Sequence, residues 1–472
     1  MPRGRDDSPD EPASGRSAKS KQSLANQHRL LELGNAVYQQ GGARRNRRKV
    51  RPHRVRRRII ISAVVLLVLI AGVVGGSYYY ANYRFNAIPR IRVAHEVKPI
   101  SGKPFNILMI GSDSRVGLSG IVARQTGATS ALVAGERSDV VKIIHVDPDA
   151  GVISMVSVPR DTVVTLLAHQ SLYGQYNRIN VNLGNGGPSL LAQTITANFG
   201  IPINQTIVVS FAGLINVADA LGGVYLDFAY PAFDPESDLW IRHAGCQLVK
   251  GPPALAVTRS RHYYYNPRGS GTIPSHWASL STSQLYSDLS NEGWLYDPTS
   301  DFGRIARQDA FLRAMIDQAK KLYNPLTINK FLSAIPQGIT LDSNFSLNEL
   351  IGLAVRFHGI NANGIRTYTL PTTAVNNTSL GDVLFVQQPY SQEQLVGIFG
   401  SQLEKPTNPP PNAQLQTLQP PFVAVTTTTL PVTTTTKKTT GKKHVTSPST
   451  TTTTANPTLA VPNFDPRPCT PT

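Results

Sequence analysis

The sequence predicts an α/β domain with a mixed central sheet flanked by helices, and two observations lead to that prediction. The apolar run "FNILMIG" at 105–111 predicts a strand, and the runs on either side of "PDAG" within 141–158 predict an antiparallel hairpin. Further along, strand and helix patterns alternate, which is typical of strands joined by helical crossovers. A sheet that contains both kinds of connection is mixed.

The remaining elements of this domain follow from local start and stop signals. "PSLLAQTITANF" at 188–199 predicts a helix that Gly200 ends, and "TIVVS" at 206–210 predicts a buried strand. A helix within 211–223 stops at paired glycines before the strand "VYLDF". The clearest helical periodicity covers 303–323, whose apolar positions recur at helical spacing.

A basic tail precedes an apolar run near the N-terminus. Residues 1–58 hold 16 Lys+Arg against 5 Asp+Glu, so they carry +11 of the formal net charge of +17. Residues 59–80 contain no charge and are long enough to cross roughly 30 Å of bilayer as a helix. Arginines 56–58 then predict a cytoplasmic N-terminus and an extracellular domain. A cleaved signal peptide is the alternative, but 58 residues are too long for its leading region.

Composition divides the chain into five segments. A membrane anchor directly after the basic tail argues against a nucleic acid partner. The Thr/Pro runs near the C-terminus cannot bury enough apolar surface to fold. Cys246 and Cys469 both fall on the extracellular side, where they can form a disulfide. The predicted segments are a disordered cytoplasmic tail with a short helix near 27–40 (1–58), a transmembrane helix (59–80), a stalk (81–100), a globular extracellular domain (101–403) and a disordered tail (404–472).

Arginines stand at the ends of predicted elements in six segments. In open α/β sheets, ligands bind at strand ends. The guanidinium fork donates two hydrogen bonds to phosphate oxygens, and aspartates among arginines suit Mg²⁺. The pattern therefore predicts a pyrophosphate site with a metal ion. The segments are "GSDSR" (Asp113, Arg115), "ERSDVV" (Arg137, Asp139), "VPRDT" (Arg160, Asp161), "NRIN" (Arg178, Asn180), "TRSRH" (Arg259, Arg261) and "DFGRIARQ" (Arg304, Arg307, Gln308).

Two other interpretations apply to some of these residues. Any one arginine can belong to a structural ion pair, but the arginines of the six segments outnumber the nearby carboxylates. The "DFG" at 301–303 is a weak kinase signal, because the chain has no HRD loop, glycine-rich loop or Walker A motif. We expect Arg259 and Arg261 to follow a strand and to project from one face of it.

The order of these motifs resembles the LytR–CpsA–Psr family over roughly residues 103–325. The likeness is carried by "ILMIGSDSR", "RSDVVKIIHVDPDAGVISMVSVPRDTVV", "LVKGPPALAVTRSRH" and "DFGRIARQDAFLRAM". The resemblance implies a membrane-anchored, Mg²⁺-dependent phosphotransferase that moves a glycopolymer from a polyprenyl-pyrophosphate carrier to peptidoglycan, with 101–403 as the catalytic domain. It implies metal ligands at Asp113 and Asp139, a pyrophosphate clamp at Arg137, Arg160, Arg259, Arg261, Arg304 and Arg307, and substrate contacts at Arg115, Arg178, Asn180 and Gln308.

Two insertions depart from the pattern of that family. Residues 116–136 separate the first two motifs, and residues 262–300 separate Arg261 from Asp301; the second insertion is interpreted as a lid or an acceptor-binding loop. The alternatives to a transferase are a non-catalytic binder of lipid-linked glycans and a pyrophosphatase. Composition suits an actinobacterium, for which arabinogalactan is the natural cargo; teichoic acid and capsule are the alternatives.

Overall fold

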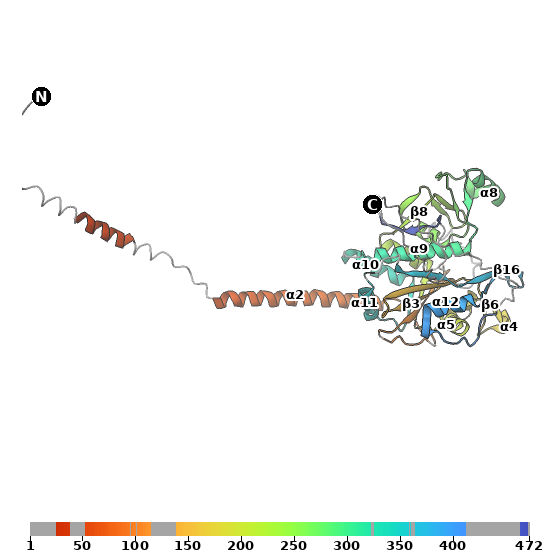
Figure 1. Cartoon of the computed structure of the whole chain (residues 1–472), viewed down its shortest axis with the longest axis horizontal. Helices are drawn as coiled ribbons and strands as arrows, with labels where there is room; N and C mark the ends of the chain where they lie inside the picture. Colours follow the sequence, from red (N-terminus) through yellow and green to blue (C-terminus); the bar gives the residue numbers. More distant parts are fainter. Residues whose placement is uncertain are drawn as a thin grey trace, which may run out of the picture. The chain divides into compact units, whose positions relative to one another are not determined.

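The computed structural model describes residues 25–37, 52–94, 96–100, 102–114, 138–321, 325–357, 359, 364–411 and 463–470 (Figure 1). The chain forms two compact units, Met1–Tyr79 and Tyr80–Thr472. In the first unit residues 25–37 form an exposed helix, where the sequence predicts a short one. The long helix α2 (Pro52–Asn86) ends in the second unit, and its part Arg56–Asn86 is long and apolar enough to cross a membrane.

A seven-stranded mixed sheet forms the centre of the second unit. Its strand order is β1-β14-β7-β2-β3-β4-β15. β2 runs parallel to β7 and antiparallel to β3, which forms the predicted hairpin with β4. The mixed sheet confirms the predicted fold class. The strands are β1 (Arg90–Ile91), β2 (Phe105–Ser112), β3 (Ser138–Asp147), β4 (Val152–Val158), β7 (Gln205–Ser210), β14 (Ile339–Asp342) and β15 (Arg366–Thr369).

Helices cover both faces of this sheet. Leu108 and Ile110 of β2 point to one face, where they pack with Leu191 and Phe399 of α5 and α12. Met109, between them, points to the opposite face, toward α6, α7 and α9. Figure 1 shows α9 across the sheet from α5 and α12. The helices are α5 (Val181–Phe199), α6 (Phe211–Ala220), α7 (Pro252–Arg259), α9 (Asp301–Ala319), α10 (Pro325–Ala334), α11 (Leu347–Arg356) and α12 (Tyr390–Phe399).

The boundaries of two helices differ from the prediction. Gly200 ends α5 in the left-handed conformation (φ 72°), as expected, but α5 begins earlier, at Val181, and bends at Gly187. The expected strand before Arg259 is instead the helix α7. Gly251 is followed there by prolines at the first helical positions and by Ala and Leu, which favour a helix start over a strand.

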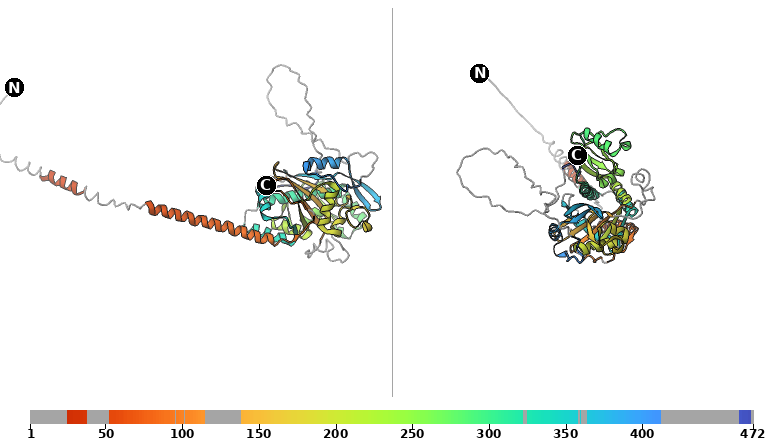
Figure 2. Two further views of the ribbon diagram at one scale, coloured as in Figure 1. Left: turned by 90° about the horizontal axis from the view of Figure 1, so that it is seen from below. Right: turned by 90° about the vertical axis from the view of Figure 1, so that its right-hand side faces the viewer.

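Two smaller sheets and a folded insertion lie beside α9. Residues 262–300 form a compact substructure in which Leu289 and Trp294 pack in one core with Phe233 of the neighbouring strand β9. It lies on the opposite side of the unit from α5 and α12 (Figure 2). Residues 116–136, the other insertion, fall outside the described residues. The elements here are β8 (Val224–Phe228), β9 (Ala232–Asp234), β10 (Leu239–Ile241), β11 (Gly245–Val249), β12 (Tyr264–Tyr265), α8 (Thr282–Asn291), β13 (Leu295–Tyr296) and β18 (Arg467–Pro468).

Short elements complete the second unit. They include two hairpin-like pairs, one of which carries Arg178. They are β5 (Val163–Thr165), α4 (Gln170–Tyr173), β6 (Tyr176–Arg178), β16 (Thr372–Thr378), β17 (Gly381–Val386) and 3₁₀ turns at Trp277–Ser279, Ile335–Gln337 and Gly400–Gln402.

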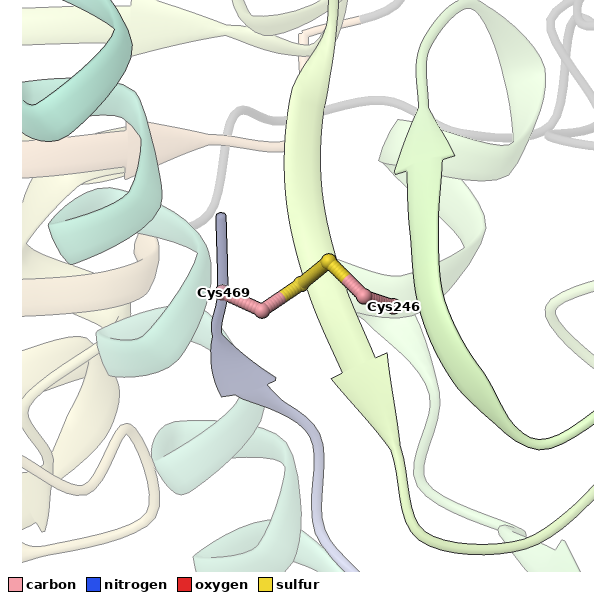
Figure 3. Close-up of a disulfide and its surroundings, with 2 residues drawn as sticks. All are labelled: Cys246 and Cys469. Carbon is pink, nitrogen blue, oxygen red and sulfur yellow. A yellow bond between two sulfur atoms is a disulfide. The ribbon is translucent and has the colours of Figure 1, made fainter. Parts of the chain in front are cut away.

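The last described residues correct the prediction that 404–472 is disordered throughout. Strand β18 pairs antiparallel with β8, and a disulfide joins Cys469 to Cys246 on β11 (Figure 3). Asp465 is buried. Composition identified the Thr/Pro stretch, but it gave no sign that Phe464, Asp465 and Cys469 have partners more than 100 residues away.

Candidate active site

A cavity of about 80 Å³ lies between the central sheet and the helices α6, α7 and α9. Its walls are mostly apolar, and charged groups lie along part of them. The helix α5 does not line this cavity, because it packs on the other face of the sheet. The lining residues that the argument uses are Met109, Phe211 and Leu312 on the apolar side, and Asp139, Lys142, Arg259, Arg304 and Gln308 on the polar side.

Local structure places each polar group at this cavity. Arg304 and Gln308 are four residues apart on α9 and so share one face of that helix. Gln308 donates from Nε2 to the carbonyl of Thr258, 2.9 Å away, which fixes α9 against α7. Arg259 is the last residue of α7, and its guanidinium lies 5.2 Å from the Phe211 ring centroid.

A network of ion pairs continues from the cavity. Arg160 lies 2.6 Å from Asp139 and 3.4 Å from Asp161. Asp301 lies 2.7 Å from Arg304 and 3.4 Å from Arg261, while Arg304 also donates to the backbone carbonyl of Asp139. Within these ion pairs four arginines share three carboxylates, so the arginines outnumber the acids that they pair with. The arginines are Arg160, Arg178, Arg261 and Arg304; the carboxylates are those of Asp139, Asp161 and Asp301.

Burial acts on Arg304 most clearly. It lowers the pKa of Arg304, and Asp301 and Asp139, whose effects are partly cancelled by Arg160 and Arg261, do not offset it. Arg160 has the opposite balance: burial lowers its pKa, but Asp139 and Asp161 more than offset that effect. A bound anion would therefore relieve the electrostatic cost at Arg304 in particular.

Asp301 belongs to the site although sequence reasoning assigned it no role. It is 9% exposed, and both of its carboxylate oxygens are buried without a hydrogen-bond partner, despite two arginines within ion-pair range. Such oxygens can accept hydrogen bonds from a bound hydroxyl. The signal that could have found it is its position three residues before Arg304 in the first turn of a helix.

A buried ion pair lies beneath the cavity. Lys142 of β3 is 1% exposed, lies 2.5 Å from Asp309 of α9, and donates to the Ser157 hydroxyl at 2.7 Å. Burial raises the pKa of Asp309, and Lys142 partly counters that effect. Because Asp309 follows Gln308 directly, this pair fixes the rotation of α9 relative to the sheet and hence the direction of Gln308.

Arg307, predicted as part of the clamp, does not line the cavity. Its side chain is 0% exposed and lies 3.0 Å from Asp297 and 2.5 Å from Asp465. Its Nη2 donates to the carbonyl of Ser260 at 3.1 Å, and its guanidinium carbon lies 4.3 Å from the Tyr263 ring centroid. The sequence spacing placed it beside Arg304, but two buried carboxylates draw it to a different face of α9.

The remaining predicted residues lie at varying distances from the cavity. Arg115 and Arg137 fall outside the described residues. Arg178 lies 3.5 Å from Asp161 and donates to the carbonyls of Leu380 and Asp382, so it borders the network. Asn180 is buried at the start of α5, where its backbone N–H donates to the carbonyl of Arg160.

The two predicted metal ligands lie at one end of the β2–β3 pair. Ser112 pairs with Ser138 and Gly111 with Val140, so the register skips Asp139, and Asp113 follows Ser112 directly. The described residues contain no group of three or more His, Cys, Asp or Glu side chains arranged to hold a metal ion. Mg²⁺ is often held by only one or two carboxylates together with phosphate oxygens and water, so this donor set fits such an ion.

Comparison with known proteins shows the family to which the chain belongs. The LytR_cpsA_psr family profile matches residues 82–269 and 294–396, more than half of the chain. The chain belongs to the LytR_cpsA_psr family. The unmatched residues 270–293 of this family member fall within the insertion that forms α8.

Two relatives of this LytR_cpsA_psr protein have names that refer to the cell wall. It is 28% identical over 303 residues to the probable cell wall biosynthesis protein LcpB of Corynebacterium glutamicum, which covers 64% of this chain and 61% of that protein. It is 25% identical over 282 residues to the polyisoprenyl-teichoic acid–peptidoglycan teichoic acid transferase TagV of Bacillus subtilis, covering 58% and 59%. The chain thus spans about three-fifths of the length of these relatives.

Among solved structures, the LytR-Csp2A-Psr enzyme from Actinomyces oris superposes with a TM-score of 0.49 at 18% sequence identity. The superposition covers 68% of this chain and 97% of that one.

Proposed function

We propose that this protein is a Mg²⁺-dependent phosphotransferase that moves a glycopolymer from a polyprenyl-pyrophosphate carrier to peptidoglycan. One observation carries the proposal: Arg259 and Arg304 line a mostly apolar cavity, and the positively charged network continues from them. A polyprenyl pyrophosphate joins an apolar chain to a dianionic head group. The apolar chain matches the apolar walls of the cavity, and the head group matches its arginines.

The reaction follows from these charges. A sugar hydroxyl of peptidoglycan attacks the phosphorus that carries the glycan, the bond to the bridging oxygen breaks, and polyprenyl phosphate leaves with that electron pair. The hydroxyl gives its proton to solvent water, and a phosphodiester joins glycan to acceptor. Arginines that contact the phosphoryl oxygens stabilise the charge that moves to the leaving group, and loss of one such donor typically costs about 10²-fold or more in rate.

Asp113 and Asp139 are the residues that would hold Mg²⁺. When bound, the ion supplies Lewis-acid neutralisation of phosphoryl charge. Asp139 is also 2.6 Å from Arg160, so it would orient that arginine whether or not the ion is bound. The residues of this chain would otherwise act by binding and orienting the head group.

The helix Arg56–Asn86 would anchor the enzyme, with its N-terminus in the cytoplasm and the catalytic unit outside. The Cys246–Cys469 disulfide supports that side, because structural disulfides form in oxidising compartments. Arabinogalactan is the cargo to test first, since composition suits an actinobacterium and a relative comes from Corynebacterium glutamicum. Teichoic acid is the next, because of the name of the Bacillus subtilis relative.

The decisive experiment supplies the full chain in detergent with a polyprenyl-pyrophosphate oligosaccharide and peptidoglycan, with and without Mg²⁺. We expect polyprenyl phosphate to be released in step with glycan-phosphate attached to peptidoglycan, and Arg259→Ala or Arg261→Ala to lower that rate about 10²-fold in a folded protein. Release without transfer would make the protein a pyrophosphatase. Donor binding without release would make it a binder, and either result would overturn the proposal.

A further inference from the structure

The C-terminal segment 463–470 contributes a buried charge to the interior of the unit. Asp465 is 1% exposed, and its carboxylate lies 2.5 Å from Arg307. The second acid at that guanidinium, Asp297, belongs to the insertion and is itself bonded by Thr299 at 2.8 Å through the backbone N–H. A guanidinium that is 0% exposed requires such partners, because an unpaired buried charge is costly.

Arg307 in turn contacts the backbone of the turn Arg259–Arg261, which carries two arginines of the site. Its Nη2 donates to the carbonyl of Ser260, the residue between Arg259 and Arg261. On the other side of the same segment, Asp234 accepts hydrogen bonds from the Ser260 hydroxyl and from the backbone N–H of Arg261. The turn that carries both arginines is thus held from two sides, by Asp234 and by Arg307.

The C-terminal segment 463–470 is itself fixed in several independent ways, so Asp465 has a defined position. The disulfide to Cys246 tethers it covalently, and β18 pairs with β8. The Phe464 ring stacks on Tyr265 with centroids 4.4 Å apart. Removing the carboxylate of Asp465 would therefore leave the segment in place and would change only what Arg307 contacts.

We propose that Asp465 is a positioning residue of the arginine site. Through Arg307 it fixes the Ser260 carbonyl, and thereby sets the directions in which Arg259 and Arg261 leave the end of α7. This inference rests on the proposed function, because it assigns Asp465 a role in orienting the groups that bind pyrophosphate. It makes the residues after the Thr/Pro stretch a part of the site, although they are about 160 residues from α9 in the sequence.

The test compares wild type, Asp465→Ala and Asp465→Asn in the full chain with the disulfide intact. For Asp465→Ala we expect kcat for lipid-linked donor to fall about 10- to 100-fold with KM changed less than about threefold, because misplacement of a binding group by about 1 Å has effects of that size. Amide hydrogen exchange should rise in peptides that cover 258–262 and stay constant in β3 and β4. Asp465→Asn keeps an acceptor for Arg307 and should show a smaller loss.

The control variant is Asp227→Asn. Asp227 is an exposed acid on β8, the strand that pairs with β18, so this variant should match wild type in every readout.

Several outcomes would overturn the inference. One is a folded Asp465→Ala protein with wild-type kcat and wild-type exchange at 258–262. Another is increased exchange spread evenly over the unit, since that indicates a purely structural role. If Asp465→Ala does not fold, Asp465→Asn decides, and wild-type kcat and exchange in it would count against the idea. If wild type itself shows no turnover, the proposed function fails, while the exchange data still test the positioning role.

Discussion

Two arginines on one helix, Arg304 and Arg307, have opposite surroundings. Arg304 lines the cavity and shares the carboxylate of Asp301 with Arg261, and Asp139 is the other acid near it. Arg307, three residues later, is fully buried between two carboxylates. Burial and neighbouring arginines lower the pKa of Arg304, whereas the two acids at Arg307 more than offset burial and raise its pKa.

The difference shows that charge balance separates a ligand-facing arginine from a structural one. The residue type and the helical position are nearly the same for both. At Arg307 two acids offset the cost of burying the charge, while at Arg304 the nearby acids do not, so a bound anion would stabilise its charge. A dianionic head group would supply that charge. The distinction between the two arginines would fail if substitution of each had the same effect on stability and on turnover.

Arg307→Ala is expected to have the largest effect, on stability. Substitution leaves the buried carboxylates of Asp297 and Asp465 without their shared partner, which typically costs about 3–5 kcal/mol. Urea denaturation of the full chain in detergent would measure it. The control, Lys320→Ala at the end of the same helix, removes a surface ion pair and should cost less than about 1 kcal/mol. Equal losses in the two variants would contradict the assignment of Arg307.

Arg304→Ala should instead act on catalysis. We expect turnover of the lipid-linked donor to fall about 10²- to 10³-fold, equivalent to about 3–4 kcal/mol of transition-state stabilisation. The free energy of unfolding should fall less than in Arg307→Ala, because Asp301 keeps Arg261 as a partner at 3.4 Å. Arg304→Lys keeps the charge without the planar fork and should recover part of the rate. Full activity in Arg304→Ala would show that the cavity arginine has no role in transfer.

Much of the fold could be predicted because its signals are local. The hairpin around "PDAG", the stop at Gly200 and the periodicity of α9 all depend on residues within a few positions of each other. The strand expected before Arg259 was wrong for a local reason as well: Gly251 and the two prolines after it start a helix, although the apolar residues that follow suit a strand. The spacing of Arg259 and Arg261, two residues apart, is compatible with either a strand or the end of a helix.

The site was harder to predict where it depends on distant contacts. Arg160, Arg259 and Arg304 could be grouped because the ends of β4, α7 and α9 converge on one side of the sheet. The burial of Arg307 depends on Asp465, which follows a Thr/Pro stretch that reads as a disordered tail. Nothing in the local sequence of either residue shows that pairing.

The pH dependence of stability sharpens the comparison with a smaller effect. Burial raises the pKa of Asp465 from 3.8 to about 6, and repulsion from Asp297 adds to it, while Arg307 and Arg467 oppose the shift. Tyr263 is the other titratable group at this guanidinium, and burial raises its pKa far above this range. Between pH 3.8 and about 6 the folded protein therefore holds a proton on Asp465 that the unfolded chain has lost, so the free energy of unfolding falls as the pH rises through that window. Relative to Asp465→Asn, which cannot titrate, wild type should lose about 2–3 kcal/mol between pH 4 and pH 7.

Urea midpoints of both proteins across that range measure the difference, and a difference that stays flat or rises with pH would mean that Asp465 is fully charged throughout. The expected fall means that the charged form of Asp465 is kept near neutral pH at a cost in stability, which is reasonable for a group whose role is to orient Arg307 toward the Ser260 carbonyl.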